Sequence, residues 1–82
     1  MLPTAIADLR PGEIATIVSI DRGGVDPVNA RQLHEMGFDK GVDVELLHRA
    51  PFGGDPIALR VGNMSVALRK SLAAMVIVER TA

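Results

Sequence analysis

The sequence predicts a mainly β protein of five short strands, with one short helix and a single helical turn. Apolar and polar residues alternate in several short runs, which is the period of two that β-strands show. Glycine and proline separate these runs. The 82 residues are 48% hydrophobic, so the chain has enough apolar side chains for a core and is not a disordered protein. Its length fits one domain, which we take as residues 1–82.

The first strand is expected over residues 13–20, after a turn at residues 9–12 and before the break at residues 21–24. Its alternation is loose, because both faces carry apolar side chains. We assign Ile14 and Val18 to the core side.

A short helix with both ends marked is expected in the loop that follows. Asp26 can accept a hydrogen bond from an early helical N–H, and Pro27 suits the first helical position, where no donor is needed. Gly37 supplies the left-handed residue that ends a helix. The helix carries one narrow apolar stripe, formed by Ala30, Leu33 and Met36.

The remaining strands are expected over residues 42–49, 57–61, 64–68 and 75–79. Gly62-Asn63 alone separates the third strand from the fourth, which is a strong hairpin signal. Residues 69–74 are read as one helical turn. This order of elements is the layout of a five-stranded SH3-like barrel. The expected core consists of Ile14, Val18, Val44, Leu46, Ile57, Leu59, Val66, Leu68 and Ile77.

Composition argues against several classes of function. The net charge of -1 gives no reason to expect nucleic acid as a partner. The chain has two Phe and no Tyr or Trp, so it has few aromatic side chains on which nucleic-acid bases could stack. With no cysteine, disulfides and thiolate metal sites are ruled out. The first ten residues show no secretory signal, and the longest apolar run, residues 72–78, is far short of the ~20 residues that span a bilayer. We expect a cytoplasmic protein without direct membrane insertion.

The residues with reactive side chains do not form a catalytic pattern. His34 and His48 lack the spacing of a metal motif, and we read them as a surface and a rim residue. The serines have no neighbouring base signature, and Gly23-Gly24 and Gly53-Gly54 lack the frame of a phosphate loop. We therefore expect no enzymatic activity, no catalytic or metal-binding residues and no cofactor.

Four segments form a recognisable pattern: Leu9-x-Pro11-Gly12, Gln32–Phe38 with Gly41 and Val44, Ala50–Ile57, and Val66–Lys70. Together they resemble the FeoA family. The resemblance runs from about Leu9 to Val78. It implies an SH3-like accessory protein of bacterial ferrous-iron uptake and partnership with FeoB, the membrane Fe²⁺ transporter with a cytosolic GTP-hydrolysing domain. The same domain type forms the C-terminal module of iron-dependent repressors, but no helix-turn-helix precedes it here.

The partner surface is expected at the exit of the helix and in the loop at residues 51–55. Phe38 follows a helix-ending glycine and Phe52 precedes two glycines, so burial of both is hard to complete, and exposed apolar groups mark interfaces. For Phe52 a core role is equally open. The predicted partner-binding residues are Met36, Phe38, Pro51, Phe52 and Asp55.

Two hypotheses about function follow. The first is an accessory protein that acts by protein–protein interaction with the transporter. The alternative is a small metal-binding or nucleic-acid-binding SH3-like protein, against which the scarcity of His and the absence of Cys count. Weak self-association stays open.

Overall fold

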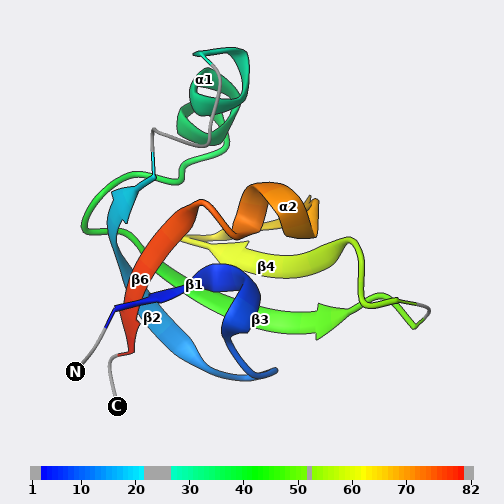
Figure 1. Ribbon diagram of the computed structural model, residues 1–82. Helices are drawn as coiled ribbons and strands as arrows, with labels where there is room; N and C mark the ends of the chain where they lie inside the picture. The colour runs from blue at the N-terminus through cyan, green and yellow to red at the C-terminus, as the bar shows by residue number, and fades with distance from the viewer. Residues whose placement is uncertain (1–2, 22–26, 52, 81–82) are drawn as a thin grey trace.

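The computed structural model describes residues 3–21, 27–51 and 53–80, and its fold is mostly β (Figure 1). In chain order the elements are β1 (Thr4–Ala5), the 3-10 turn η1 (Ile6–Asp8), β2 (Ile14–Ile20), α1 (Pro27–Glu35), β3 (Asp43–Arg49), β4 (Ile57–Val61), β5 (Met64–Leu68), α2 (Lys70–Ala73) and β6 (Val76–Arg80).

The strands form one antiparallel sheet in the order β1-β6-β2-β3-β4-β5, which curls around the core in an SH3-like fold (Figure 1). All five predicted strands are present within a residue or two of their expected bounds. β1 was not expected. It has two residues, which pair with Val78 and Ile77 of β6. Two residues are too few to show an alternating pattern in a sequence. The formation of such a strand depends on its partner strand.

Two β-bulges bend the sheet. The β2–β6 register shifts between Ile17 and Ser19, and the β3–β4 register shifts between Leu46 and His48. Each shift leaves one residue, Val18 or Leu47, without an opposite partner. An extra residue of this kind bends its strand and increases the local twist, which helps a small sheet to close on itself.

The predicted core is correct in β3 and β4 and wrong in β2 and β6. Five predicted residues are buried, namely Val44, Leu46, Ile57, Leu59 and Leu68. In β2, however, Ala15 and Ile17 face the core, Ile14 is 48% exposed and Val18 is the half-buried bulge residue.

The same error occurs in β6, where Val76 and Val78 are buried and Ile77 is only half-buried; Val66 in β5 is also half-buried. Both misread strands carry apolar residues on both faces, so their alternation does not mark the inner one. A shift of one residue then exchanges the two faces.

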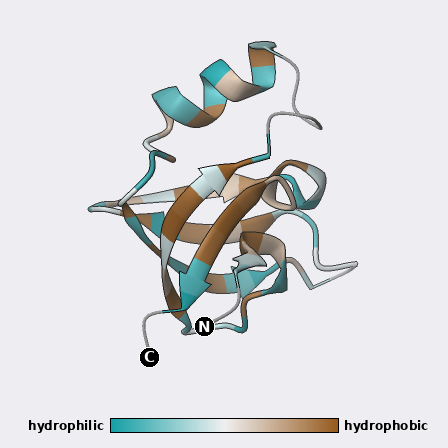
Figure 2. Cartoon of the chain, turned by 60° about the vertical axis from the view of Figure 1, so that its left-hand side comes forward, coloured by the Kyte–Doolittle hydropathy of each residue, from teal (hydrophilic) through white to brown (hydrophobic). Residues whose placement is uncertain are grey.

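α1 stands at one end of the barrel and is anchored mainly by its C-terminal turn (Figures 1 and 2). Leu33 is its one buried residue. Pro27 begins the helix as predicted, and the predicted cap Asp26 lies outside the described residues. Gly37 has a φ of +92°, which confirms the left-handed position that ends the helix.

Candidate partner surface

Phe38 is buried, at 1% exposure, so the expectation that it is exposed is wrong. The reason lies in how α1 ends. The N–H of Gly37 donates to the carbonyl of His34, at 3.0 Å, and the N–H of Phe38 donates to that of Leu33, at 2.9 Å. This pair of bonds is a Schellman motif, in which the residue after the glycine packs near the residue five positions earlier.

Leu33 and Phe38 therefore belong together in the core cluster. The sequence contains the pattern of this motif: the apolar Leu33, then three residues, then Gly37 and directly after it Phe38. The motif explains why an aromatic side chain next to a glycine is a core residue here.

The other predicted partner residues lie on two separate parts of the molecule. Met36, at the exit of α1, is half-buried and packs against the core. Pro51 and Asp55 are exposed in the β3–β4 loop, which projects from the barrel away from α1 (Figures 1 and 2). Phe52 lies outside the described residues. The structure thus does not join the helix exit and the loop into one patch.

Asp55 also has a structural contact. Its Oδ1 accepts a hydrogen bond from the backbone N–H of Lys70, at 2.9 Å. Lys70 begins α2, whose own N-cap residue, Arg69, makes no side-chain capping bond. The loop carboxylate therefore satisfies an N–H that the start of a helix leaves unpaired.

A groove of about 560 Å³ separates α1 from the end of β2. Its lining combines apolar and polar residues, namely Val18, Ser19, Ile20, Ala30, Arg31, His34, Phe38, Asp39 and Lys40. The ring of His34 contacts the Asp39 carboxylate through Nδ1, at 2.6 Å, with both side chains largely in solvent.

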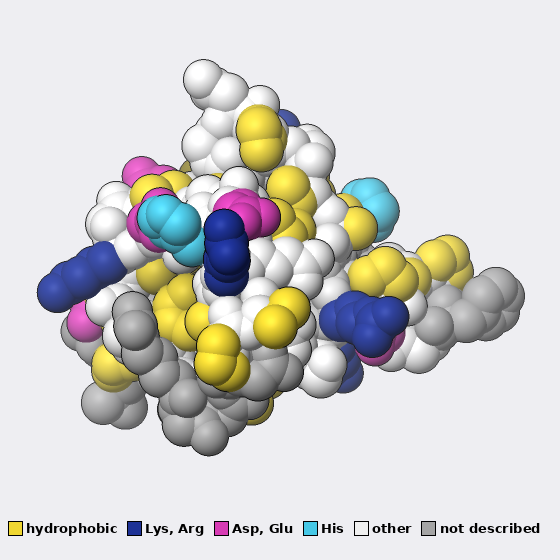
Figure 3. Space-filling view, turned by 90° about the horizontal axis from the view of Figure 1, so that it is seen from above, with side chains coloured by type: hydrophobic (Ala, Val, Ile, Leu, Met, Phe, Trp, Pro, Cys, Tyr) yellow, Lys and Arg dark blue, Asp and Glu magenta, His cyan; other side chains and the backbone are white. Residues whose placement is uncertain are grey.

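Among the described residues, this histidine–carboxylate pair has no third candidate ligand beside it. Within the residues that the structure describes, no group of three or more His, Cys, Asp or Glu side chains is placed to hold a metal ion. His48 is exposed on β3, and the two histidines lie apart on the face seen from the α1 side (Figure 3).

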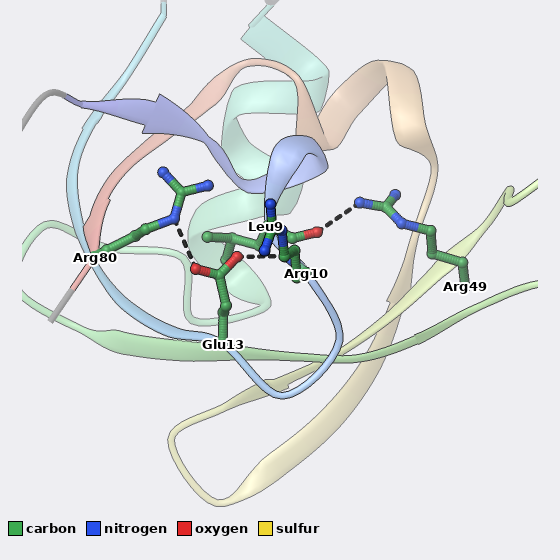
Figure 4. Close-up of polar contacts among 5 residues, drawn as sticks. All are labelled: Leu9, Arg10, Glu13, Arg49 and Arg80. Atoms are coloured by element: carbon green, nitrogen blue, oxygen red, sulfur yellow. Dashed lines mark hydrogen bonds and ion pairs between the residues drawn. The ribbon is translucent and has the colours of Figure 1, made fainter. Parts of the chain in front are cut away.

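A set of polar contacts that the sequence did not reveal holds the N-terminal segment on the barrel (Figure 4). Arg49 Nη2 donates to the carbonyl oxygens of Ala7 and Leu9, at 2.6 and 2.7 Å. Nearby, the Glu13 carboxylate accepts bonds from the backbone N–H of Arg10 and from Arg80 Nε, the latter at 2.7 Å. The partners lie up to 67 positions apart in the chain, beyond the reach of local sequence patterns.

These bonds lower the pKa of Glu13. The largest cause is the bond from the Arg10 N–H, followed by the bond from the Arg80 guanidinium. Both favour the ionised carboxylate over its protonated form. The site is therefore a structural clasp, which orders the segment that leads into β2.

The fold defines a small SH3-like β-barrel protein. The family model described as FeoA domain matches residues 4–80. The chain therefore belongs to the FeoA family. Comparison with curated protein sequences gives no match.

Solved structures agree with this assignment. An iron uptake regulatory protein (FeoA) is 30% identical, with 98% of this chain and 99% of the other covered and a TM-score of 0.78. FeoA of Stenotrophomonas maltophilia, solved with zinc, is 33% identical over 93% of this chain and 89% of its own, with a TM-score of 0.81. That protein is described as a prokaryotic SH3 domain protein and a candidate activating factor of bacterial ferrous iron transport.

A manganese-dependent transcriptional repressor shares the fold at 20% identity and a TM-score of 0.84, over 95% of this chain but 41% of the repressor. At this identity the likeness shows the fold alone. Among the helices that the structure describes, none is long and apolar enough to cross a membrane.

Proposed function

We propose that this protein is a cytoplasmic accessory protein of bacterial ferrous-iron uptake, and that it acts by protein–protein contact with a FeoB-like membrane transporter. The match of the FeoA family model over residues 4–80 carries the proposal. A related protein described as an iron(II) transport protein, from Clostridium thermocellum, supports it at 33% identity. A non-enzymatic role fits the ion pairs among the described residues, each of which joins two side chains and none of which extends into a larger cluster.

The test is co-purification of the chain with the complete transporter in detergent, with and without GTP. We expect the wild-type chain to be retained on immobilised transporter and to be lost when the transporter lacks its cytosolic GTP-hydrolysing domain. A chain that is retained on neither form would contradict the proposal.

Since the helix exit and the β3–β4 loop lie apart, they need separate variants. Met36→Glu tests the first, and Pro51→Ser and Phe52→Asp test the second. Ile14→Asp is a matched control, because Ile14 is an exposed apolar residue on the outer side of β2. We expect at least one of the three test variants to lose retention while Ile14→Asp keeps it. Loss in all four, or in none, would refute this placement of the partner surface.

The alternative, a metal-binding role, receives support from the zinc in the Stenotrophomonas maltophilia structure. The nearest counterpart among the described residues is the His34–Asp39 pair, which supplies two donor groups. Structural zinc sites have four ligands, so this pair by itself makes a weak site. The accessory role is therefore the better-supported function.

A further inference from the structure

β5 is an open edge of the sheet. It lies at one end of the strand order and has five residues. The edge strand at the other end, β1, has two residues and is therefore the shorter of the two edges. Natural edge strands are protected by short length, charged residues, proline or bulges. β5 reads Met-Ser-Val-Ala-Leu, without charge or proline, and its register with β4 runs without a shift. Of these devices, the described β5 has no charged residue, no proline and no bulge.

The register shows which backbone groups face outward. Gly62 N–H donates to the carbonyl of Asp43, at 3.5 Å, so Val61 directs its own N–H and C=O away from β3, toward Met64. Because antiparallel bonds alternate along a ladder, Met64, Val66 and Leu68 bond to β4. The N–H and C=O groups of Ser65 and Ala67 then point out of the sheet. Both residues are exposed, and no other described residue bonds to these groups.

A groove adjoins the C-terminal end of this edge, at Ala67. It has a volume of about 570 Å³ and is lined by Asn29 and Gln32 of α1, Ala67 of β5, and Arg69, Ser71, Leu72 and Met75. α1 therefore forms the wall opposite Ala67 and residues 69–75. The side-chain amide of Gln32 has both a donor and an acceptor for the outer edge of an inserted chain.

The core-facing side of β5 is incompletely covered. Met64 lies opposite the buried Val61 but is 55% exposed, and Val66, opposite the buried Leu59, is half-buried. In a further strand paired with β5, every second side chain would lie on the core-facing side of the sheet and would cover Met64 and Val66. At the far end of the strand, Arg69 and Lys70 are exposed, and neither forms an ion pair within the described residues.

We propose that the groove between β5 and α1 binds an extended segment of a partner protein, which adds a strand to β5. The segment has apolar residues at alternate positions, which cover Met64 and Val66, and an Asp or Glu that lies beside Arg69. Main-chain hydrogen bonds to Ser65 and Ala67 supply affinity, and the alternate side chains and the charge supply selectivity. The inference rests on the proposed function only in taking a protein as the partner.

The probe is a synthetic peptide of alternating Val and Thr that ends in two Asp residues, titrated into the ¹⁵N-labelled full chain. We expect saturable shifts of the amide signals of β5, Arg69 and Gln32, and about tenfold slower hydrogen exchange at the Ser65 and Ala67 amides. The same peptide methylated at alternate backbone nitrogens, which cannot complete the ladder, should not bind. Equal binding of the methylated peptide would overturn the proposal.

Two pairs of variants sharpen the test. Ala67→Pro removes an outward N–H that β4 does not use, so the barrel should fold and peptide binding should be lost, whereas Ala67→Ser should bind as the wild type. Arg69→Glu should weaken the acidic peptide about tenfold and strengthen a peptide ending in two Lys. Unchanged binding by folded Ala67→Pro would refute strand addition. If Ala67→Pro does not fold, the methylated peptide decides.

Other occupants give distinct results. Shifts in β5 that grow with protein concentration in the absence of peptide, with a dimer in sedimentation, would show that a second copy takes the edge and would overturn the proposal. Shifts confined to the groove between α1 and β2 would also overturn it. The titration contains no transporter, so its outcome is independent of the co-purification. If the peptide does not bind but the transporter co-purifies, strand addition fails and the proposed function stands. If the peptide binds but the transporter does not co-purify, strand addition stands and the transporter role fails.

Discussion

Glu13 and Arg80 form an ion pair at 2.7 Å that joins the start of β2 to the end of β6, two strands that neighbour each other in the sheet. The Glu13 carboxylate also bonds the Arg10 N–H, and together these bonds lower the pKa of the carboxyl in the folded chain. A carboxyl group with a lowered folded pKa stabilises the fold above its unfolded pKa and loses that contribution as the pH falls through the folded pKa.

The first prediction concerns pH. The stability that Glu13 contributes should be complete at neutral pH and should decline as the pH falls below the ordinary glutamate value of 4.5. Glu13→Gln should lower the melting temperature at neutral pH and flatten its decline in acid. Thermal unfolding followed from neutral to acidic pH measures this. Glu79→Gln, at an exposed residue of β6, is the control, and an identical pH profile for both variants would contradict the clasp.

A second prediction concerns Arg49, whose guanidinium bonds the carbonyls of Ala7 and Leu9. Arg49→Ala should lower the free energy of unfolding by about 1.5–3 kcal/mol, the range for hydrogen bonds to a charged group. Arg60→Ala is the control, because Arg60 is 55% exposed and pairs with Glu45 at the surface, where an ion pair contributes at most about 1 kcal/mol. Urea unfolding should separate the two, and an equal loss would show that Arg49 does not hold the N-terminal segment.

The Schellman motif supplies the third prediction. Gly37→Val should destabilise the protein by more than about 1 kcal/mol, because a β-branched residue is strained at a φ of +92°. The strain is in the backbone, since an added Cβ would meet only Val61 Cγ1, at an ordinary 3.5 Å. Gly37→Asn should lose less, because Asn tolerates the left-handed region better. Unchanged melting temperatures in both variants would contradict the assignment of the cap.

Core truncations test the fold and the corrected register of β2. Leu59→Ala, at a fully buried residue, should cost about 2–5 kcal/mol, a large share of the stability of a small domain. Ile17→Ala should fall in the same range, whereas Ile14→Ala should cost far less because Ile14 is 48% exposed. Chemical denaturation measures all three. A larger loss for Ile14 than for Ile17 would restore the register expected from the sequence.

The last prediction concerns metal. Calorimetric titration of the purified chain with Fe²⁺ at neutral pH should show no binding tighter than roughly the millimolar range, which corresponds to about 4 kcal/mol. His34 is paired with Asp39, and the described residues bring no third ligand to them. Stoichiometric micromolar binding that disappears in His34→Ala or His48→Ala would instead favour the metal-binding alternative.

Local signals in the sequence determined the order of the elements, the hairpin at Gly62-Asn63, the start of α1 at Pro27 and its end at Gly37. These features depend on backbone conformations that a few adjacent residues dictate, such as a fixed φ in proline or a positive φ in glycine. Four local segments, one of which contains Gly37, carried the resemblance to the family.

The tertiary structure decided which face of β2 and β6 is buried, because apolar residues occupy both faces and only packing selects one. It buried Phe38 beside Leu33, a contact that needs the whole C-terminal turn of α1. It also brought Arg49 to Ala7 and Arg80 to Glu13, and placed α1 across a groove from the open edge of β5. The contacts of Arg49 and Arg80 and the placement of α1 join residues far apart in the chain, so they arise only when the sheet closes.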